Sequence, residues 1–324
     1  MRRIKIIVDF IKDLLKAREK PTYAGKASSY QLMRLLFVIS DGLVLNFISK
    51  FLKKKSNPKF LNNSYKIMPY INLDEINEIK EEILKMKISL HKNEKTTIKF
   101  DINNNIDFDY YKNEKIVRLN ILSEDIISNH KVISFLIKNI NFDTLKKIIG
   151  SDLYLIGINC WITLPVPNIE ENYERTAIYE DTQMWHRDVD NLRDIKHLIY
   201  LTDVLDETSG SFEIVKNTHF FSWFNPFNYF NKIKFRVKND FVEKKYSDKI
   251  FSFLGKAGTN FLVDTRALHR GKIITKQKHF RIVLQLYLSN HFFGKDKKQI
   301  LYKKYNSYEI LKDNKYFLPM LLME

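Results

Sequence analysis

The chain has 324 residues, of which 44% are hydrophobic, and it carries a formal net charge of +16. This length and composition provide a sizeable core for one elaborated domain or two modest ones, and the 24 Phe and 17 Tyr favour strands and pockets over coiled coil or disorder. The single cysteine, Cys160, excludes an intramolecular disulfide and is consistent with a reducing compartment.

The positive charge is concentrated at the amino-terminal end. Residues 1–60 contain fourteen basic and four acidic residues, which gives this segment a net charge of +10. Apolar residues at helical spacing predict an amphipathic helix over residues 2–19. Asp9 and Asp13 interrupt its apolar face and no small-residue cleavage site follows, so we expect a cytoplasmic protein rather than a secreted one.

A second apolar segment, residues 35–49, contains Asp41 and Gly42 and is too short for a comfortable membrane span. Two alternatives remain for residues 1–60. They dock on the anionic inner surface of a membrane, or they pack on the main domain and leave a basic face in solvent, which is the more common behaviour of amphipathic helices.

The next part of the chain is predicted to be mainly helical. Residues 72–92 and 113–150 have apolar residues at helical spacing, and the Asn- and Asp-rich residues 101–109 are typical of a loop. We therefore divide this half into a basic helical extension, residues 1–70, and a helical support region, residues 71–150.

The pattern changes after Gly150 to short alternating segments separated by turn residues. These predicted strands are residues 153–164, 194–202, 211–215, 259–264 and 281–289. The sequence thus predicts an α+β protein, in which residues 151–290 form a double-stranded β-helix, a jelly-roll, cupin-like barrel with helices packed outside. Residues 291–324 are predicted to be a helical tail.

Three residues in this second half form a candidate metal site, and a fourth, Arg281, is a candidate for binding a carboxylate. His186 and Asp188 are two positions apart, so on an extended chain they point to the same side. His269 follows one predicted strand and Arg281 begins the next. Two histidines and one carboxylate leave open positions on a metal and form the facial triad of non-haem iron(II) oxygenases. A planar guanidinium suits a carboxylate of a 2-oxo acid.

The motifs around these residues resemble the phytanoyl-CoA dioxygenase family of iron(II)- and 2-oxoglutarate-dependent oxygenases, over roughly residues 150–290. The matching segments are Gln183-x-x-His186-x-Asp188, Ser209 to Val215 leading to His219, Gly258 to Asp264 with Leu268 to Gly271, and Arg281 before an apolar strand. The resemblance implies iron(II) on His186, Asp188 and His269, the co-substrate 2-oxoglutarate on Arg281, support from Gln183, and O2 as oxidant.

The sequence also departs from that family. Lys216-Asn217-Thr218-His219 stands where Pro-Gly-Ser-His is common, and Val283 replaces a hydroxyl residue two places after the arginine. One hydrogen bond to the co-substrate is therefore expected to be missing. Halogenating relatives lack the metal carboxylate, so the presence of Asp188 favours hydroxylation.

Other residues compete for roles in the site. His197, His219 and His279 are alternative ligands, although His197 shares a strand face with Ile195 and Ile199 and is better explained as a hydrogen-bonded core histidine. Substrate contacts are expected from residues near the triad and in the aromatic cluster 220–230, which either covers the pocket or packs on the amino-terminal helices. These candidates are Trp185, Arg187, His219 and Trp223.

The leading hypothesis is a dioxygenase that hydroxylates an unactivated carbon of a small, anionic metabolite, acyl thioester, sugar or lipid. The alternative is an inactive binding module of the same fold for an anionic ligand, a membrane surface or nucleic acid. No nucleic-acid recognition motif supports the latter, and a pure binder has no need of an open metal site.

Overall fold

The computed structural model describes most of the chain between residues 63 and 289. The described ranges are 63–89, 95–101, 105–114, 116–149, 154–166, 183–188, 195–218, 236–237, 239–265 and 267–289, with short pieces at 301–302 and 321–322. The helix predicted for residues 2–19, the apolar segment 35–49 and the aromatic cluster 220–230 lie outside the described residues.

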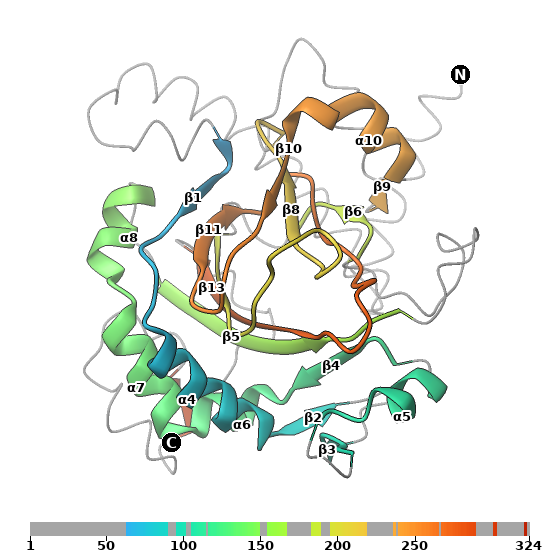
Figure 1. Cartoon of the computed structure of the whole chain (residues 1–324). Coiled ribbons are helices and arrows are strands. Elements are labelled where there is room, and N and C mark those ends of the chain that lie inside the picture. The colour runs from blue at the N-terminus through green and yellow to red at the C-terminus, as the bar shows by residue number, and fades with distance from the viewer. Residues whose placement is uncertain are drawn as a thin grey trace, which may run out of the picture.

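Two antiparallel sheets form the centre of the molecule (Figure 1). The eight-stranded sheet has the order β1-β11-β7-β13-β5-β4-β2-β3 and the five-stranded sheet the order β10-β8-β12-β6-β9. The strands of the large sheet are β1 (Tyr65–Ile67), β2 (Lys87–Ser89), β3 (Lys95–Thr97), β4 (Arg118–Ile121), β5 (Tyr154–Thr163), β7 (Ile195–Tyr200), β11 (Asn260–Asp264) and β13 (Arg281–Ser289). Those of the small sheet are β6 (Trp185–His186), β8 (Phe212–Val215), β9 (Arg236–Val237), β10 (Ile250–Phe253) and β12 (His269–Gly271).

Helices cover the outer face of the large sheet, and α10 lies beside the small sheet (Figure 1). The described helices are α4 (Leu73–Leu84), α5 (Phe108–Asn113), α6 (Ser123–Ser128), α7 (His130–Asn139), α8 (Phe142–Ile149) and α10 (Asn239–Tyr246), followed by a 3-10 turn at Ser247–Lys249. None of the helices in the described ranges is long and apolar enough to cross a membrane.

The sequence explains where the covering helices begin. The Asn72 side chain accepts a hydrogen bond from the Asp74 backbone N–H at 2.7 Å, and Asn129 does the same for Val132 at 3.1 Å. Each asparagine satisfies a backbone donor that the first helical turn leaves free. Every third or fourth residue of α4 and α7 is then apolar and buried against the large sheet.

Two segments predicted to be helical are strands instead. The helix expected over residues 72–92 ends at Leu84, and Lys87–Ser89 is β2; within the predicted helical region 113–150, Arg118–Ile121 is β4. In β4 the buried Leu119 and Ile121 alternate with partly exposed residues. This segment is a strand because it pairs with β5. The prediction missed the pairing because β5 is distant in the sequence and helical periodicity does not report it. The described parts of the predicted helical tail, residues 301–302 and 321–322, are the short strands β14 and β15.

The strands predicted after Gly150 are confirmed, and their alternation separates two cores. In β13, Ile282, Leu284, Leu286 and Leu288 pack toward the helices, whereas Val283 packs toward the small sheet. The two sheets therefore face each other across a shared core that includes Phe212 and Ile214 of the small sheet. We call this space the inter-sheet core.

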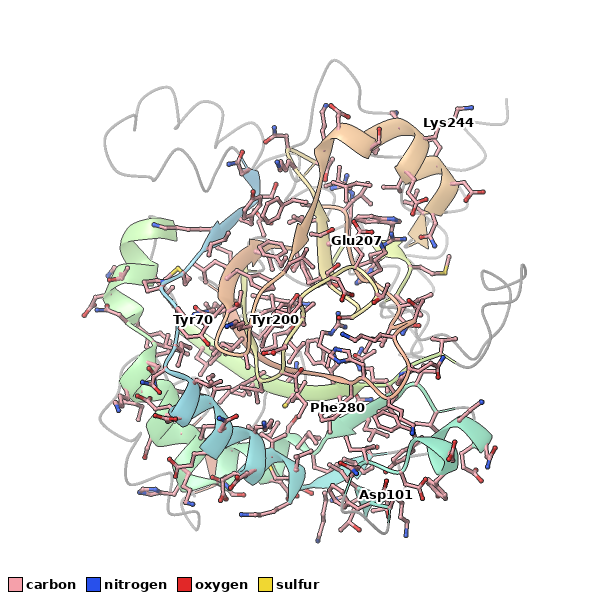
Figure 2. All side chains as sticks on the ribbon, viewed as in Figure 1. Tyr70, Asp101, Tyr200, Glu207, Lys244 and Phe280 are labelled. Carbon is pink, nitrogen blue, oxygen red and sulfur yellow. The ribbon has the colours of Figure 1, made fainter. Side chains whose placement is uncertain are left out.

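Tyr200 of β7 ties the two sheets together near the middle of this core (Figure 2). Its hydroxyl donates to the backbone carbonyl of Phe253 at 3.1 Å and accepts from the backbone N–H of Phe212 at 2.9 Å. Both partners belong to the small sheet. The phenol thus satisfies its own buried polar atom and fixes the spacing of the sheets.

His197 lies on the opposite face of β7 and is a core residue, as predicted. Its Nε2 is 2.8 Å from Asn260 Oδ1, and Asn260 Nδ2 donates to the Pro69 carbonyl at 2.7 Å. Since Asn260 presents its oxygen to the ring, Nε2 carries the proton and donates. Burial lowers the pKa of His197 to about 4.

We predict that His197 makes stability depend on pH. Its pKa rises from about 4 in the folded chain to the ordinary value of 6.5 on unfolding, so its contribution is complete above pH 6.5 and is lost as the pH falls toward 4. This difference in the pKa of His197 corresponds to about 3 kcal/mol in the free energy of unfolding. Chemical denaturation of wild type and His197→Gln between pH 4 and 7.5 measures it: the variant should lose much less stability over this range. Identical pH profiles would contradict the assignment.

Candidate metal centre

Two histidines face each other on a pair of neighbouring strands of the small sheet. His186 of β6 and His269 of β12 are direct partners in the antiparallel register, and their ring centroids lie 4.3 Å apart. Facing residues on neighbouring strands point to the same side of the sheet. The pairing of β6 with β12 therefore brings together two residues that are far apart in the sequence.

Asp188 completes the cluster from the segment just after β6. One carboxylate oxygen, Oδ2, is 3.3 Å from His269 Nε2, and Oδ1 is 3.7 Å from His186 Nε2. The backbone N–H of Asp188 donates to the Thr265 carbonyl at 2.9 Å, which fixes the segment after the strand. Candidate ligand atoms from the three residues all lie within 4.8 Å of one another, so one metal ion can contact all of them.

Both imidazole rings are oriented by backbone carbonyls. His186 Nδ1 is 2.8 Å from the Met184 carbonyl, and His269 Nδ1 is 2.9 Å from that of Ala267. A carbonyl only accepts hydrogen bonds, so each Nδ1 carries the proton. Each Nε2 then presents a lone pair toward Asp188, which is the form in which neutral histidine binds a metal.

The charge states also suit metal binding. Burial, followed by repulsion from neighbouring His269, lowers the pKa of His186 to about 3, so this ring is neutral at physiological pH. Burial alone would raise the pKa of Asp188. The Lys196 ammonium, in direct contact with Oδ2, and His269 together hold that pKa well below its usual range. The cluster therefore offers a neutral imidazole beside an ionised carboxylate.

Arg281, at the start of β13, lies beside Gly271 of the strand that carries His269. Its side chain is 4% exposed, and its Nη2 donates to the Thr163 hydroxyl at 3.3 Å. Its Nε and Nη1 have no hydrogen-bond partner among the described residues. Burial lowers the pKa of the guanidinium to about 10, so it remains charged at neutral pH. A buried cation with two unsatisfied donors is costly unless an anion binds there.

Gly271 gives this guanidinium its access to the space between the sheets. A Cβ at Gly271 would lie 3.0 Å from Arg281 Nη2, so a larger side chain would crowd the head group. Gly271 is two residues beyond His269 on the same strand, a separation of roughly 7 Å. The arginine head group and the histidine pair thus border neighbouring parts of one space.

Thr163 places a hydroxyl beside Arg281 that the sequence did not indicate. Val283 is buried in the inter-sheet core, but Thr163 of β5 is the direct register partner of Arg281 and contacts its Nη2. The side chain of Thr163 is itself 3% exposed. Sequence alone gave no signal for it, because the pairing joins residues 118 positions apart.

The remaining predicted residues are placed as follows. Gln183 is buried three residues before His186, and Arg187 donates through Nη1 to the Thr218 carbonyl. Trp185 is fully buried and packs with Val215 and Leu268 on the face of the small sheet away from the histidines. Neighbouring residues of a strand point to opposite faces, so this placement gives no support to the substrate contact predicted for Trp185, which stays a prediction. His219 and Trp223 lie outside the described residues.

Lys196 also belongs to the candidate site, although it was not among the predicted site residues. Its ammonium contacts Asp188 and lies 5.4 Å from the centroid of the Tyr287 ring, which belongs to its register partner on β13. The alternation of side chains along the strand could have predicted its position. If His197 faces the outer core with Ile195 and Ile199, then Lys196 must face the inter-sheet core.

No protein-family model matches the sequence, and no curated protein matches it. Among solved structures, the chain is similar to HygX from Streptomyces hygroscopicus with nickel and 2-oxoglutarate bound, with a TM-score of 0.47 and 13% identity over 76% of this chain and 88% of that one. It is also similar to SnoK, a non-heme alpha ketoglutarate dependent carbocyclase from nogalamycin biosynthesis, with a TM-score of 0.42 and 12% identity over 71% and 80%. At these levels the similarities define neither the fold family nor the activity of this chain.

We predict that removing one ligand side chain abolishes tight metal binding. Asp188→Ala and His269→Ala should each weaken Co(II) binding by more than about 100-fold, because loss of a ligand costs more affinity than loss of a residue that only supports a ligand. Isothermal titration calorimetry measures this. His197→Gln, which alters a buried histidine outside the cluster, should bind Co(II) as wild type does. Equal affinity in all four proteins would place the metal elsewhere.

Proposed function

We propose that the chain is an iron(II)- and 2-oxoglutarate-dependent dioxygenase that hydroxylates an unactivated carbon of a small, anionic metabolite. The observation that carries this proposal is Arg281, a buried cation with open donors that lies beside Gly271, two residues from His269 of the cluster of two histidines and a carboxylate. The sequence resemblance to phytanoyl-CoA dioxygenases supports the same assignment. Within it, residues 151–290 are the catalytic core, and the strands that this segment contributes to the two sheets correspond to a double-stranded β-helix.

The three ligand residues fit iron(II). Two imidazole nitrogens and one carboxylate are the donor set of the facial triad, and they leave three positions for other ligands. Lys196 balances the carboxylate charge and limits the freedom of Asp188 to turn. His186, Asp188 and His269 would hold the metal.

The surroundings of Arg281 fit the far carboxylate of 2-oxoglutarate. The open N–H of Nε or Nη1, together with the second N–H of Nη2, can make two parallel hydrogen bonds to a carboxylate, and Thr163 lies within reach to add a hydroxyl. Gly271 leaves the approach unobstructed. The acid would extend from Arg281 toward the histidine pair, which orients its keto end to the metal.

When bound, iron with 2-oxoglutarate and O2 supplies the oxidising chemistry, in which the 2-oxo acid loses CO2 to become succinate and a C–H bond becomes C–OH. The protein residues position the reactants and exclude water. Phe212 stacks against His269 with ring centroids 5.5 Å apart, and it gives one side of the histidine pair an apolar wall.

The substrate would approach from the side of the metal away from Arg281. Tyr287 and Lys196 line that part of the large sheet, six residues along β13 from Arg281. Because the Lys196 ammonium is already paired with Asp188, the anionic character of the substrate stays a prediction. A cytoplasmic location, with residues 1–60 in contact with an anionic membrane, stays a prediction.

Anaerobic reconstitution tests the proposed activity. Addition of iron(II) and then 2-oxoglutarate should produce a visible metal-to-ligand charge-transfer band, and admission of O2 should release succinate, faster in the presence of substrate from a panel of anionic metabolites. Incorporation of 18O from labelled O2 into the product would identify hydroxylation. If iron binds but neither the band nor succinate appears, the chain is a binding module.

We predict that Arg281→Met raises the KM for 2-oxoglutarate by about 10- to 100-fold, because hydrogen bonds to a charged group contribute about 1.5–3 kcal/mol. Metal affinity should stay within about twofold of wild type, since Arg281 is not a ligand. Lys138→Met, which removes an exposed lysine of α7, serves as the control for loss of one positive charge. An unchanged KM would show that another group binds the acid.

A further inference from the structure

A second pair of residues lies directly behind the two histidines. Because β12 and β6 are antiparallel with His269 opposite His186, Arg270 is opposite Trp185 on the other face of the sheet. The Arg270 guanidinium lies over the Trp185 ring, 4.5 Å from its centroid. The two strands that carry the histidines are thus joined by side-chain contacts on both faces.

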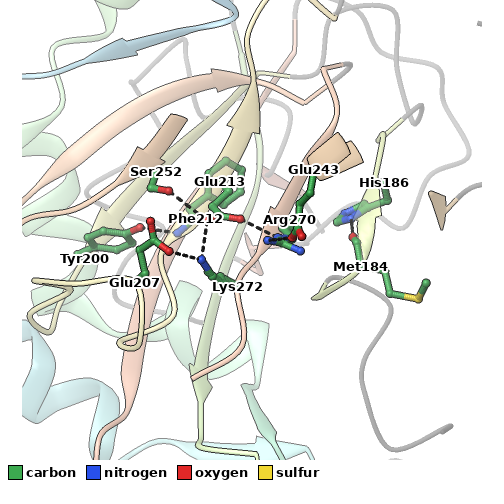
Figure 3. Close-up of polar contacts among 10 residues, drawn as sticks. All are labelled: Met184, His186, Tyr200, Glu207, Phe212, Glu213, Glu243, Ser252, Arg270 and Lys272. Atoms are coloured by element: carbon green, nitrogen blue, oxygen red, sulfur yellow. Dashed lines mark hydrogen bonds and ion pairs between the residues drawn. The ribbon is translucent and has the colours of Figure 1, made fainter. Parts of the chain in front are cut away.

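Arg270 is also anchored from two further elements (Figure 3). Its Nε donates to Glu213 Oε2 at 2.7 Å, and its Nη2 donates to Glu243 Oε1 on α10 at 3.2 Å. Glu213 is the register partner of Arg270 on β8, and its other oxygen accepts from Ser252 at 3.1 Å. We call Trp185, Arg270, Glu213 and Glu243 the Arg270 brace.

The histidine-bearing strand β6 has little backbone pairing of its own. It is two residues long and pairs with β12 at one register position, His269 with His186. On its other side is the two-residue strand β9. Backbone hydrogen bonds therefore fix the position of β6 relative to β12 only weakly, and the contact between Trp185 and Arg270 adds a second constraint.

Stability alone does not explain a buried charged group here. Arg270 is 6% exposed and Glu213 is 2% exposed, and well-packed apolar residues at such positions are often as stable or more so. The residues beside them, Val215, Val242 and Leu268, already form an apolar cluster around Trp185. A guanidinium differs from an apolar side chain in having a planar, directional set of donors that permits few orientations.

We propose that Arg270 is a positioning residue: held by Glu213 and Glu243 and stacked on Trp185, it fixes the separation of His186 and His269 so that both present Nε2 to one metal ion. This inference rests on the proposed metal-dependent function. In this proposal Trp185 supports the two histidine-bearing strands from the face opposite the candidate metal site.

Cobalt(II) binding by the full chain tests the brace. The dissociation constant is measured by calorimetry, and the visible absorption bands of bound Co(II) report ligand geometry, for wild type, Arg270→Met and Arg270→Lys. Arg270→Lys keeps a cation beside Glu213, so it remains informative if Arg270→Met does not fold. Ile133→Val, in the buried face of α7, is the control that lowers the melting temperature without touching the brace.

We expect Arg270→Met to weaken Co(II) binding by about tenfold, the lower end of the range for changes around a ligand shell, with altered absorption bands. Arg270→Lys should lie between it and wild type, because an ammonium cannot stack flat on Trp185 while bonding two carboxylates. Ile133→Val should melt earlier and bind as wild type does.

Two results would overturn the proposal in distinguishable ways. If wild type binds Co(II) and folded Arg270→Lys matches it in both affinity and spectrum, the brace has no positioning role, although the metal site stands. If wild type itself binds no Co(II), the proposed function and the brace both fail.

Discussion

Face-to-face packing of the two antiparallel sheets places the candidate site residues of the described chain. The large sheet contributes Arg281, Thr163 and Lys196 to the space between the sheets, and the small sheet contributes the two histidines. Tyr200 fixes the spacing with hydrogen bonds to both Phe212 and Phe253. Apolar contacts provide most of the driving force for this packing, but the polar contacts decide its register.

The site is built from strand faces rather than from a contiguous motif. Alternation turns one residue toward the His186–Asp188–His269 cluster and its neighbour toward the opposite core, so each candidate site residue has a structural partner next to it. His186 and Trp185 show this on β6, and His269 and Arg270 on β12. A one-residue shift in register would exchange these roles, which makes the site sensitive to anything that loosens the short strands.

Much of this arrangement follows from the sequence. The spacing of His186 and Asp188 and the strand pattern around Arg281 predicted a cluster that the structure brings together, and alternation correctly placed His197 in the core. Strand β2, which pairs with nearby β3, was missed because the helical pattern of α4 was extended across it, and strand β4 was missed because its partners, β2 and β5, are distant in the sequence. Thr163 was missed for the same reason, since nothing local in the sequence shows which residue will face an arginine on another strand.

We propose that one metal ion and one 2-oxo acid occupy the space between His269 and Arg281. An anaerobic crystal structure with Mn(II) and 2-oxoglutarate tests it most directly, with anomalous scattering to locate the metal. We expect a metal peak within bonding distance of His186, Asp188 and His269, and a carboxylate on the guanidinium of Arg281. A metal bound elsewhere, or an acid that does not reach Arg281, would contradict it.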